Sequence, residues 1–311
     1  MPAKLLKVKA KESYKDFSKR SGTFVEANEI NHIIDYDCDA YDENGEPLFF
    51  FRKNVIPANL CKRAYYALRS AATGTNNRGD AAGFHTPSDN TSINGQMLSS
   101  GKPQKRFTVV KKDGTLDSVA RANQVNSGIV GYFDRNVRFP YCRQTAWTDK
   151  NMPNFHKSKA YIQAISEQFK IACPDRWQAQ HDIANQTNND FLIEDTVFTT
   201  ITVNKNFRTA IHKDAGDFEK GLGNIAVLQA GDYKGGETCL PRYGIGFNVR
   251  NTDVCFFNVH EWHGNLPVTA KKPYERISLV CYYRKNMSKC GSKDEELEIV
   301  KRRKNFKGLN V

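Results

Sequence analysis

The second half of the chain alternates between short apolar runs and polar or glycine-containing breaks. Such runs, rich in β-branched residues, are typical of β-strands. We expect strands at residues 197–203, 224–230, 238–241, 246–249, 253–259 and 276–283. Because short strands separated by glycine turns are typical of two stacked sheets, the pattern predicts a double-sheet jelly roll.

Upstream, apolar residues at helical spacing predict two helices, one opening at Pro57 and one over residues 154–172. The apolar positions are Leu60, Ala64, Leu68 and Ala71 in the first helix, and Tyr161, Ile165, Phe169 and Ala172 in the second. We therefore predict an α+β fold: a double-stranded β-helix (jelly-roll) core buttressed by helices.

Two further stretches before the second helix carry local signals. Residues 33–37 and 48–51 flank Asn44-Gly45, a pair typical of a hairpin turn, so we expect an antiparallel pair there. Residues 73–126 are rich in Gly, Asn, Ser and Asp and show little regular pattern. A polar stretch of this length is either disordered or a functional loop region.

The chain shows no internal repeat and no linker that would force a second domain. We predict a basic N-terminal arm at 1–22, flexible or partly helical, and a single domain at 23–290 with the jelly-roll core at about 195–285. Residues 291–311 form a charged C-terminal tail that contains the basic run 301–304. For both basic segments, a solvated surface and a nucleic-acid contact remain alternatives.

The overall charge changes this picture only modestly. With 46 basic and 34 acidic residues among 311, the net charge is +12, which suits a polyanionic partner. The eight cysteines include no CxxC pair, so we expect reduced, mostly buried thiols in a cytosol-like compartment and no structural zinc.

No run approaches the ~18 apolar residues of a membrane span, and the N-terminus has no apolar signal core. We therefore expect a soluble, intracellular protein without a membrane partner. It would be associated with a nucleus or nucleoid, or be made in a host cell.

Candidate chemistry is concentrated between residues 199 and 284. His212 and Asp214 are two residues apart, so on an extended chain they share a face, and either His260 or His263 can add a second imidazole. Two histidines and one carboxylate occupy one face of a non-haem Fe(II) ion and leave positions open for O2 and an organic co-substrate. The residues predict oxygen-dependent hydroxylation at this centre.

Arg276 and Ser278 alternate along the last predicted strand and therefore share its inward face. A guanidinium group suits a carboxylate, and a neighbouring hydroxyl adds a hydrogen bond, so the pair fits the far carboxylate of 2-oxoglutarate. The alternative is a structural salt bridge of Arg276, with Asp253 as its partner.

Five segments resemble the TET/JBP family of Fe(II)- and 2-oxoglutarate-dependent dioxygenases. They are 199–204 (Thr-Thr-Ile-Thr-Val-Asn), 212–217 (His-Lys-Asp-Ala-Gly-Asp), 235–241, 263–267 (His-Gly-Asn-Leu-Pro) and 276–283 (Arg-Ile-Ser-Leu-Val-Cys-Tyr-Tyr). The resemblance covers roughly residues 195–290, and segments 48–56 and 77–79 resemble small members more loosely. It implies oxidation of the methyl group of 5-methylcytosine or thymine in DNA to hydroxymethyl, and possible further oxidation.

The resemblance implies roles for individual residues. His212, Asp214 and His263 would be the iron ligands and the catalytic centre. Arg276, helped by Ser278, would hold 2-oxoglutarate. Of the two candidate histidines, the resemblance favours His263 and leaves His260 a supporting role.

The same resemblance places Asp217, Tyr282 and Arg284 around the target base. The alternative for Asp217 is a turn residue that caps the bend at Gly216. Asn77 and Arg78 would help to hold the base or the co-substrate. Because a paired base is inaccessible inside a duplex, the DNA partner would present it flipped out or single-stranded.

Two other functions fit the sequence. The chain can be a 2-oxoglutarate oxygenase of another substrate, such as a free nucleotide, RNA, an alkylated base or a protein side chain. It can also be a DNA-binding jelly roll without catalysis, although the intact ligand set argues against that. The sequence does not distinguish cytosine from thymine substrates and gives no oligomeric state.

Overall fold

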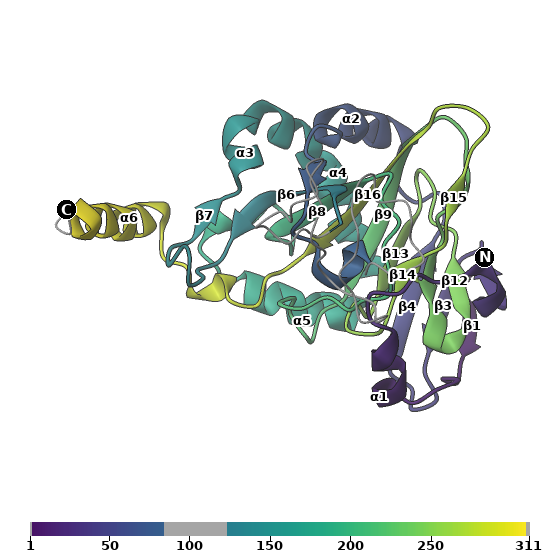
Figure 1. The fold of residues 1–311 in the computed structure, drawn as a ribbon. Helices are drawn as coiled ribbons and strands as arrows, with labels where there is room; N and C mark the ends of the chain where they lie inside the picture. Colours follow the sequence, from purple (N-terminus) through teal and green to yellow (C-terminus); the bar gives the residue numbers. More distant parts are fainter. Residues whose placement is uncertain (1, 84–122, 309–311) are drawn as a thin grey trace, which may run out of the picture.

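A twisted ten-stranded sheet forms the centre of this computed structural model, which describes residues 2–83 and 123–308, with side chains through residue 303 (Figure 1). Its strands, in spatial order, are β1 (Lys4–Lys7), β3 (Cys38–Tyr41), β4 (Pro47–Arg52), β13 (Val254–Phe257), β9 (Gly223–Ala230), β16 (Glu275–Tyr282), β8 (Thr200–Lys205), β6 (Val125–Phe133) and β5 (Thr73–Thr75), with β7 (Arg143–Gln144) paired to β6.

A smaller four-stranded sheet faces this large sheet. It contains, in order, β14 (Gly264–Asn265), β11 (Thr238–Leu240), β12 (Ile245–Phe247) and β2 (His32–Ile34). A separate ribbon pairs β10 (Lys234–Gly235) with β15 (Val268–Thr269). The two facing sheets agree with the predicted jelly-roll core.

Helices cover the other face of the large sheet, as predicted. Both expected helices are present, as α2 (Ala58–Leu68) and α4 (Met152–Ala172), and they pack against each other. The remaining helices are α1 (Tyr14–Phe17), α3 (Ala146–Lys150), α5 (Pro174–Ala184) and α6 (Lys293–Gly308). Figure 1 shows α2, α3 and α4 on one side of the sheet and α6 projecting away from the body.

The alternation of side chains along β9 shows how the large sheet is buried on both faces. Ala226 and Leu228 belong to the apolar cluster beneath the helices, whereas Ile225 and Val227 belong to the cluster between the two sheets. This division follows from the two-residue period of a strand. It explains why the run appeared in the sequence as almost continuously apolar.

The face between the sheets changes character from one end to the other. On β13, Cys255 and Phe257 fill it with apolar groups. On β16 and β8, which lie beyond β9 in the sheet, the same face carries Ser278, Thr202 and Asn204, which line a cavity. The sandwich is therefore packed at one end and hollow and polar at the other.

The predicted hairpin is correct in its turn and wrong in its first strand. The strand that pairs with β4 is Cys38–Tyr41, and Gly45 takes a positive φ of 86° in the turn. Residues 32–34 instead pair in parallel with β12 in the small sheet. Between them the chain passes from one sheet to the other, where the Asp37 carboxylate accepts from the Lys53 backbone N–H at 2.8 Å.

The polar stretch 73–126 contains regular structure that its composition did not predict. β5 lies inside it, and β6 begins at its end, while residues 84–122 lie outside the described residues. Strand β6 includes glycines, which weaken a strand signal. At Gly128 a side chain is impossible without movement, because a Cβ would lie 1.9 Å from the Ala71 carbonyl oxygen.

Both terminal segments contact the body of the protein. Strand β1 extends the large sheet by pairing in parallel with β3, and Phe17 in α1 is buried. At the other end the basic run 301–304 belongs to α6, which continues from the acidic segment as one helix. The boundaries 1–22, 23–290 and 291–311 stay a prediction. None of the helices in the described ranges is long and apolar enough to cross a bilayer.

The expectation of eight reduced cysteines is wrong for one pair. Cys142 and Cys290 form a disulfide, whereas the other six cysteines are free and buried. The two partners are separated by 148 residues and come together only because the chain after β16 returns to β7. Nothing in their local sequence marks this pairing.

This disulfide gives a direct test of the fold. Thiol titration of the unfolded protein without reductant should count six thiols, not eight. Because the bond closes a long loop, Cys142→Ser should lower the free energy of unfolding by about 2–4 kcal/mol. Cys173→Ser, at a buried free cysteine, is the control. Eight titratable thiols, or equal stability of Cys142→Ser and the wild type, would contradict the pairing.

Candidate metal centre

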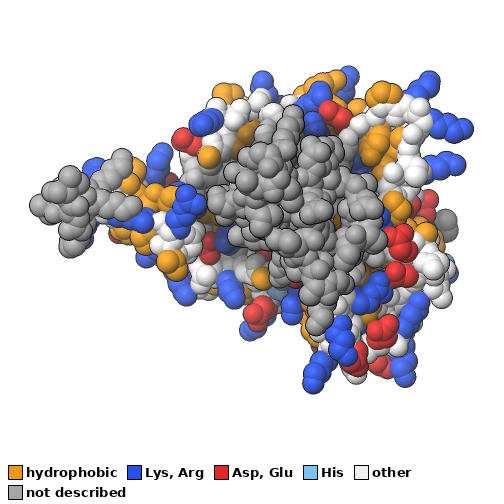
Figure 2. Space-filling view, viewed as in Figure 1, with side chains coloured by type: hydrophobic (Ala, Val, Ile, Leu, Met, Phe, Trp, Pro, Cys, Tyr) orange, Lys and Arg blue, Asp and Glu red, His pale blue; other side chains and the backbone are white. Residues whose placement is uncertain are grey.

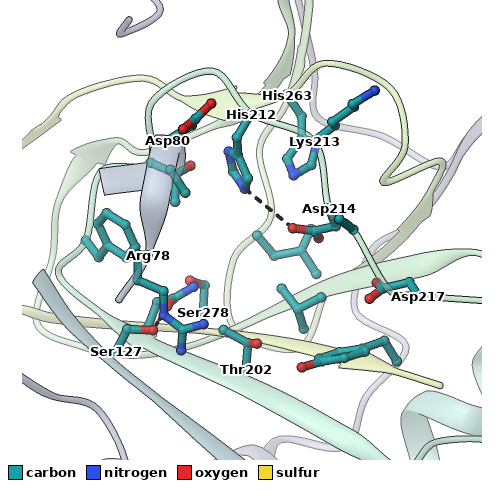
Figure 3. A pocket seen from close by; sticks show the side chains of 18 of the residues that line it. Arg78, Asp80, Ser127, Thr202, His212, Lys213, Asp214, Asp217, His263 and Ser278 are labelled. Atoms are coloured by element: carbon teal, nitrogen blue, oxygen red, sulfur yellow. Dashed lines mark hydrogen bonds and ion pairs between the residues drawn. The ribbon is translucent and has the colours of Figure 1, made fainter. Parts of the chain in front are cut away.

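A cavity of about 750 Å³ lies between the two sheets at the polar end of the sandwich (Figure 3). Strands β16, β8 and β6 form one wall, and the loop after β8 forms another. Nine of the ten predicted site residues line it: Asn77, Arg78, His212, Asp214, Asp217, His263, Ser278, Tyr282 and Arg284. The tenth, Arg276, lies behind the wall.

His212, Asp214 and His263 come together as a candidate metal centre. Their ligand atoms all lie within 4.8 Å of one another, and His212 Nε2 is 3.7 Å from Asp214 Oδ1. Figure 3 shows the His212 and Asp214 side chains directed at each other, with His263 beside them. Two imidazoles and one carboxylate in this arrangement form the facial set that non-haem Fe(II) accepts.

Backbone pairing fixes the two imidazoles. His212 N–H donates to the His263 carbonyl and His263 N–H donates to the His212 carbonyl, each at 2.9 Å. This isolated two-residue bridge joins the loop after β8 to the start of β14. It sets the rings 4.3 Å apart, centroid to centroid.

Hydrogen bonds to the ring nitrogens determine which atoms are available to a metal. Nδ1 of His212 lies 2.8 Å from the Ala210 carbonyl oxygen, and Nδ1 of His263 lies 2.8 Å from the Glu261 carbonyl oxygen. A carbonyl only accepts, so both Nδ1 atoms carry the proton and donate it. Each Nε2 is left with its lone pair for a metal ion.

Burial also keeps His263 neutral. Its side chain is enclosed, and this desolvation, with the neighbouring His212, lowers the pKa of His263 to about 4. A neutral imidazole is the form that binds a metal. Metal binding at neutral pH therefore does not have to displace a proton from His263.

The alternative histidine, His260, is outside this group. Its Nδ1 lies 3.2 Å from the Asp214 carbonyl oxygen, and its Nε2 is buried without a partner. It therefore contacts the backbone of a ligand residue and does not join the ligand atoms. As an iron ligand, His263 stays the prediction that the geometry favours.

Arg276 carries a buried charge: burial lowers its pKa, while the Tyr233 hydroxyl and the Glu237 carboxylate nearby favour the charged form. Arg276 is only 3% exposed. Its Nη2 donates to the Gly236 carbonyl at 3.0 Å, and its Nε has no hydrogen-bond partner among the described residues. Among the described residues, no carboxylate forms an ion pair with it; Asp253 instead pairs with Lys53 at 3.4 Å. The salt-bridge alternative therefore lacks its partner. An unpaired buried guanidinium is costly, which marks the position as an anion site.

The backbone of Gly236 approaches Arg276 closely, and a side chain there would meet both Val268 and Arg276. Gly236 has a φ of 75°, and a Cβ there would lie 3.2 Å from Arg276 Nε. The Gly236 carbonyl also lies 3.4 Å from the Asn265 amide nitrogen, and Asn265 lines the cavity. The Gly236 carbonyl thus lies between the Arg276 guanidinium and Asn265, a residue of the cavity lining.

A polar row that the sequence analysis missed crosses the cavity wall. Ser278 on β16 lies opposite Asn204 on β8, which lies opposite Ser127 on β6. The Asn204 and Ser127 side chains hydrogen-bond to each other. The signal for Asn204 was present, because it alternates with Thr202 in a strand. Ser127 was not recognisable before the strand order was known.

Asp217 and Arg284 form the opposite end of the cavity. They face each other in an isolated backbone bridge, and Arg284 Nε donates to Asp134 Oδ1 at 2.7 Å. Asp217 is only 8% exposed, and this burial, with Asp214 nearby, raises the pKa of its carboxyl well above the usual value. Gly216, with a φ of 99°, makes the bend, so Asp217 is both a turn residue and a cavity residue.

Arg78 and Asn77 approach from the segment after β5. Arg78 is largely buried and donates to the Gly128 carbonyl at 3.3 Å, and Figure 3 shows its guanidinium reaching toward Thr202 and Ser127. Asn77 is exposed at the rim. Lys213, in contrast, points away from the triad. The binding roles of these residues stay predictions.

Removing a ligand should weaken metal binding without unfolding the protein. His212→Ala and Asp214→Ala should each leave the protein folded but lower its affinity for Fe(II) or Mn(II) at least about tenfold, because two ligands remain. Equilibrium dialysis with metal analysis measures this. His156→Gln, at an exposed histidine of α4, is the control and should bind metal normally. Unchanged affinity in both ligand variants would contradict the centre.

Comparison with known proteins adds the family. Residues 128–285, just over half the chain, match the family model described as the oxygenase domain of the 2OGFeDO superfamily, Tet_JBP. Thymine dioxygenase JBP1 of Trypanosoma brucei brucei is 36% identical over 191 residues, covering 60% of this chain and 22% of the relative. The bifunctional helicase and thymine dioxygenase JBP2 of Trypanosoma cruzi is 30% identical over 252 residues, covering 79% of this chain and 19% of the relative.

This chain thus spans about a fifth of the length of these curated relatives. Among solved structures, NgTET1 in complex with 5mC DNA superimposes with a TM-score of 0.57 at 13% identity, covering 97% of this chain and 91% of the other. That likeness concerns the fold, which is the one the sequence predicted. Together with the matched model, the ligand geometry and the fold place this chain in the Tet/JBP family of 2-oxoglutarate- and Fe(II)-dependent oxygenases.

Proposed function

We propose that this protein is an Fe(II)- and 2-oxoglutarate-dependent dioxygenase that oxidises the methyl group of a pyrimidine, 5-methylcytosine or thymine, in DNA. The observation that carries the proposal is the composition of one cavity. Its lining combines a facial metal triad with a buried carboxyl beside a guanidinium, and the buried Arg276 guanidinium lies just behind its wall.

The triad of His212, Asp214 and His263 fits Fe(II), because both imidazoles present Nε2 and the carboxylate is within reach of them. When bound there with 2-oxoglutarate, iron uses O2 to oxidise the co-substrate to succinate and CO2 and to insert one oxygen atom into a C–H bond. The protein's part is to hold the ligands in place, orient both substrates and exclude water.

Arg276 and Ser278 fit the far carboxylate of 2-oxoglutarate. Arg276 offers an unpartnered Nε in a dry environment, where a charged hydrogen bond is strong. Ser278 lies two residues along the same face of β16 and adds a hydroxyl at the cavity wall. The co-substrate would therefore extend from the metal toward the closed end of the cavity.

The opposite end fits a pyrimidine. Asp217 and Arg284 together offer both acceptor and donor groups, and Tyr282 adds a ring to the wall. Both 5-methylcytosine and thymine present mixed donor and acceptor edges, so each base can satisfy this pair. A cavity of about 750 Å³ accommodates a nucleotide, provided that the base leaves the stack.

The substrate class is supported by several lines. The net charge of +12 suits DNA, and the two relatives carry the name thymine dioxygenase. A DNA substrate would place the protein where DNA is held, in a nucleus, a nucleoid or an infected cell. Because the chain spans a fifth of those relatives, the proposal concerns the chemistry of this cavity and not their other activities.

Arg276 provides a test of the co-substrate site. Arg276→Gln should weaken 2-oxoglutarate binding about tenfold to a hundredfold, because a charged hydrogen bond contributes about 1.5–3 kcal/mol. The measurement is equilibrium binding to the Fe(II)-loaded protein without oxygen, with Arg250→Gln, a nearby guanidinium that already has a carboxylate partner, as control. Equal affinities of the wild type and Arg276→Gln would remove Arg276 from the site.

Nucleoside mass spectrometry provides the test of the activity itself. The protein is incubated with Fe(II), 2-oxoglutarate, O2 and DNA containing 5-methylcytosine and thymine. Gain of 5-hydroxymethylcytosine or 5-hydroxymethyluracil, absent in Asp214→Ala, is the expected result. Succinate release without either product would move the substrate to another class, and no succinate at all would contradict the chemistry.

A further inference from the structure

The loop between β6 and β7, residues 134–142, presents an apolar side chain to solvent beside the cavity. Val137 at its tip is fully exposed, at 102% of its reference area, and contacts no core cluster. The start of the loop belongs to the cavity wall: Phe133 lines the cavity, and Asp134 pairs with Arg284 at 2.7 Å. The exposed valine is therefore connected directly to the proposed base-binding end.

The loop is stiff at its tip. Asn136 N–H donates to the Phe139 carbonyl at 2.8 Å, and Phe139 N–H donates to Asn136 Oδ1 at 2.9 Å, which closes a tight turn around Val137. The Arg143 guanidinium lies 4.2 Å from the centroid of the Phe139 ring and 5.0 Å from that of Phe133. These contacts hold the tip in place without covering Val137.

The loop is also anchored at its base. Cys142 forms the disulfide with Cys290, and its backbone N–H donates to the buried Glu296 carboxylate at 2.7 Å. The same carboxylate binds Arg135 through two nitrogen atoms. The disulfide and the buried ion pair fix the base of the loop, so the tip keeps its position when a partner contacts it.

Positive charge surrounds this apolar tip. Arg138 is exposed, packs against Phe139 and forms no ion pair with a described residue. Arg303 of α6 donates to the Arg138 carbonyl at 2.6 Å, which holds this part of α6 against the loop; Lys301 and Arg302 are exposed on other sides of the same helix. Of the acids near the loop, Glu296 is paired with Arg135 and Asp134 with Arg284, whereas Asp294 and Glu295 at the start of α6 are exposed; Lys301 is paired with Glu298. Figure 2 shows Lys and Arg side chains where α6 leaves the body. An apolar tip amid cations fits a partner with phosphates outside and apolar base faces inside.

The tip is also at a suitable distance. Val137 is four positions after Phe133, and an extended chain of that length spans at most about 14 Å. Base steps are about 3.4 Å apart along a strand, so Val137 lies within about four steps of a nucleotide held in the cavity.

We propose that Val137 is an apolar wedge that enters the duplex beside the target base and fills the gap left when that base occupies the cavity. Arg138 and the exposed basic residues of α6 contact the flanking phosphates. Apolar side chains between base steps are an established way to stabilise an unstacked duplex. The proposal rests on the proposed function, because it takes a pyrimidine in DNA as the target, and it adds double-stranded DNA as the preferred form.

The test compares kcat/KM on matched double- and single-stranded oligonucleotides. Val137→Ser should lose about tenfold or more on the duplex, because the cost of unstacking is no longer offset, and should keep wild-type turnover on the single strand. Val137→Leu, which keeps an apolar wedge, should retain duplex turnover. Ile171→Ser on α4, another exposed apolar residue, is the control. Unchanged duplex turnover in Val137→Ser, or an equal loss on both substrates, would overturn the proposal.

A binding measurement separates this proposal from the proposed function. A duplex with 2-aminopurine next to the target base should become more fluorescent when wild-type protein unstacks it, and less so with Val137→Ser, without any turnover. A rise that depends on Val137 in a protein that oxidises no DNA would retain the wedge and reject the proposed activity. Oxidation of single strands with no such rise would retain the activity and reject the wedge.

Discussion

Two backbone hydrogen bonds between His212 and His263 are the constraint on which the candidate site depends. They join the loop after β8 to the residue just before β14. These two segments do not pair with each other in any sheet of the described residues. Each histidine then donates Nδ1–H to the carbonyl of the residue two positions earlier, so both imidazoles are oriented in the same way. The metal-binding face is thus formed by the backbone before any metal arrives, which reduces the cost of ordering the ligands.

The inward face of the large sheet changes from apolar to polar side chains along the sheet, and its polar part forms the rest of the site. Where β4, β13 and β9 meet the small sheet, their inward side chains are apolar and pack. Where β16, β8 and β6 continue the same face, inward positions such as Ser278, Thr202 and Asn204 carry hydroxyl and amide groups, and Thr238 and Asn265 of the small sheet also line the cavity. One fold therefore combines a stable core with a cavity that holds polar groups in a row. Arg276, on β16, lies where the packed and open regions meet.

The sequence was most informative where chemistry and periodicity coincide. The HxD pair, the Arg276–Ser278 alternation and strands such as β9 and β13 were recognisable because one chain segment carries the whole signal. Contacts that depend on strand order were not. Ser127 meets Asn204 only because β6 is next to β8, and Cys142 meets Cys290, 148 positions later in the sequence, only when the chain between them has folded. Glycines hid β6, although they are what allows it to pass against Ala71.

The most direct test of this account is an anomalous diffraction map of crystals grown with Mn(II), an oxygen-stable substitute for Fe(II), and 2-oxoglutarate. The account predicts a single strong peak bound by Nε2 of His212, Nε2 of His263 and the Asp214 carboxylate, with the far carboxylate of the co-substrate at Arg276. A peak bound by His260 in place of His263, or no peak at the triad in protein that is folded, would contradict it.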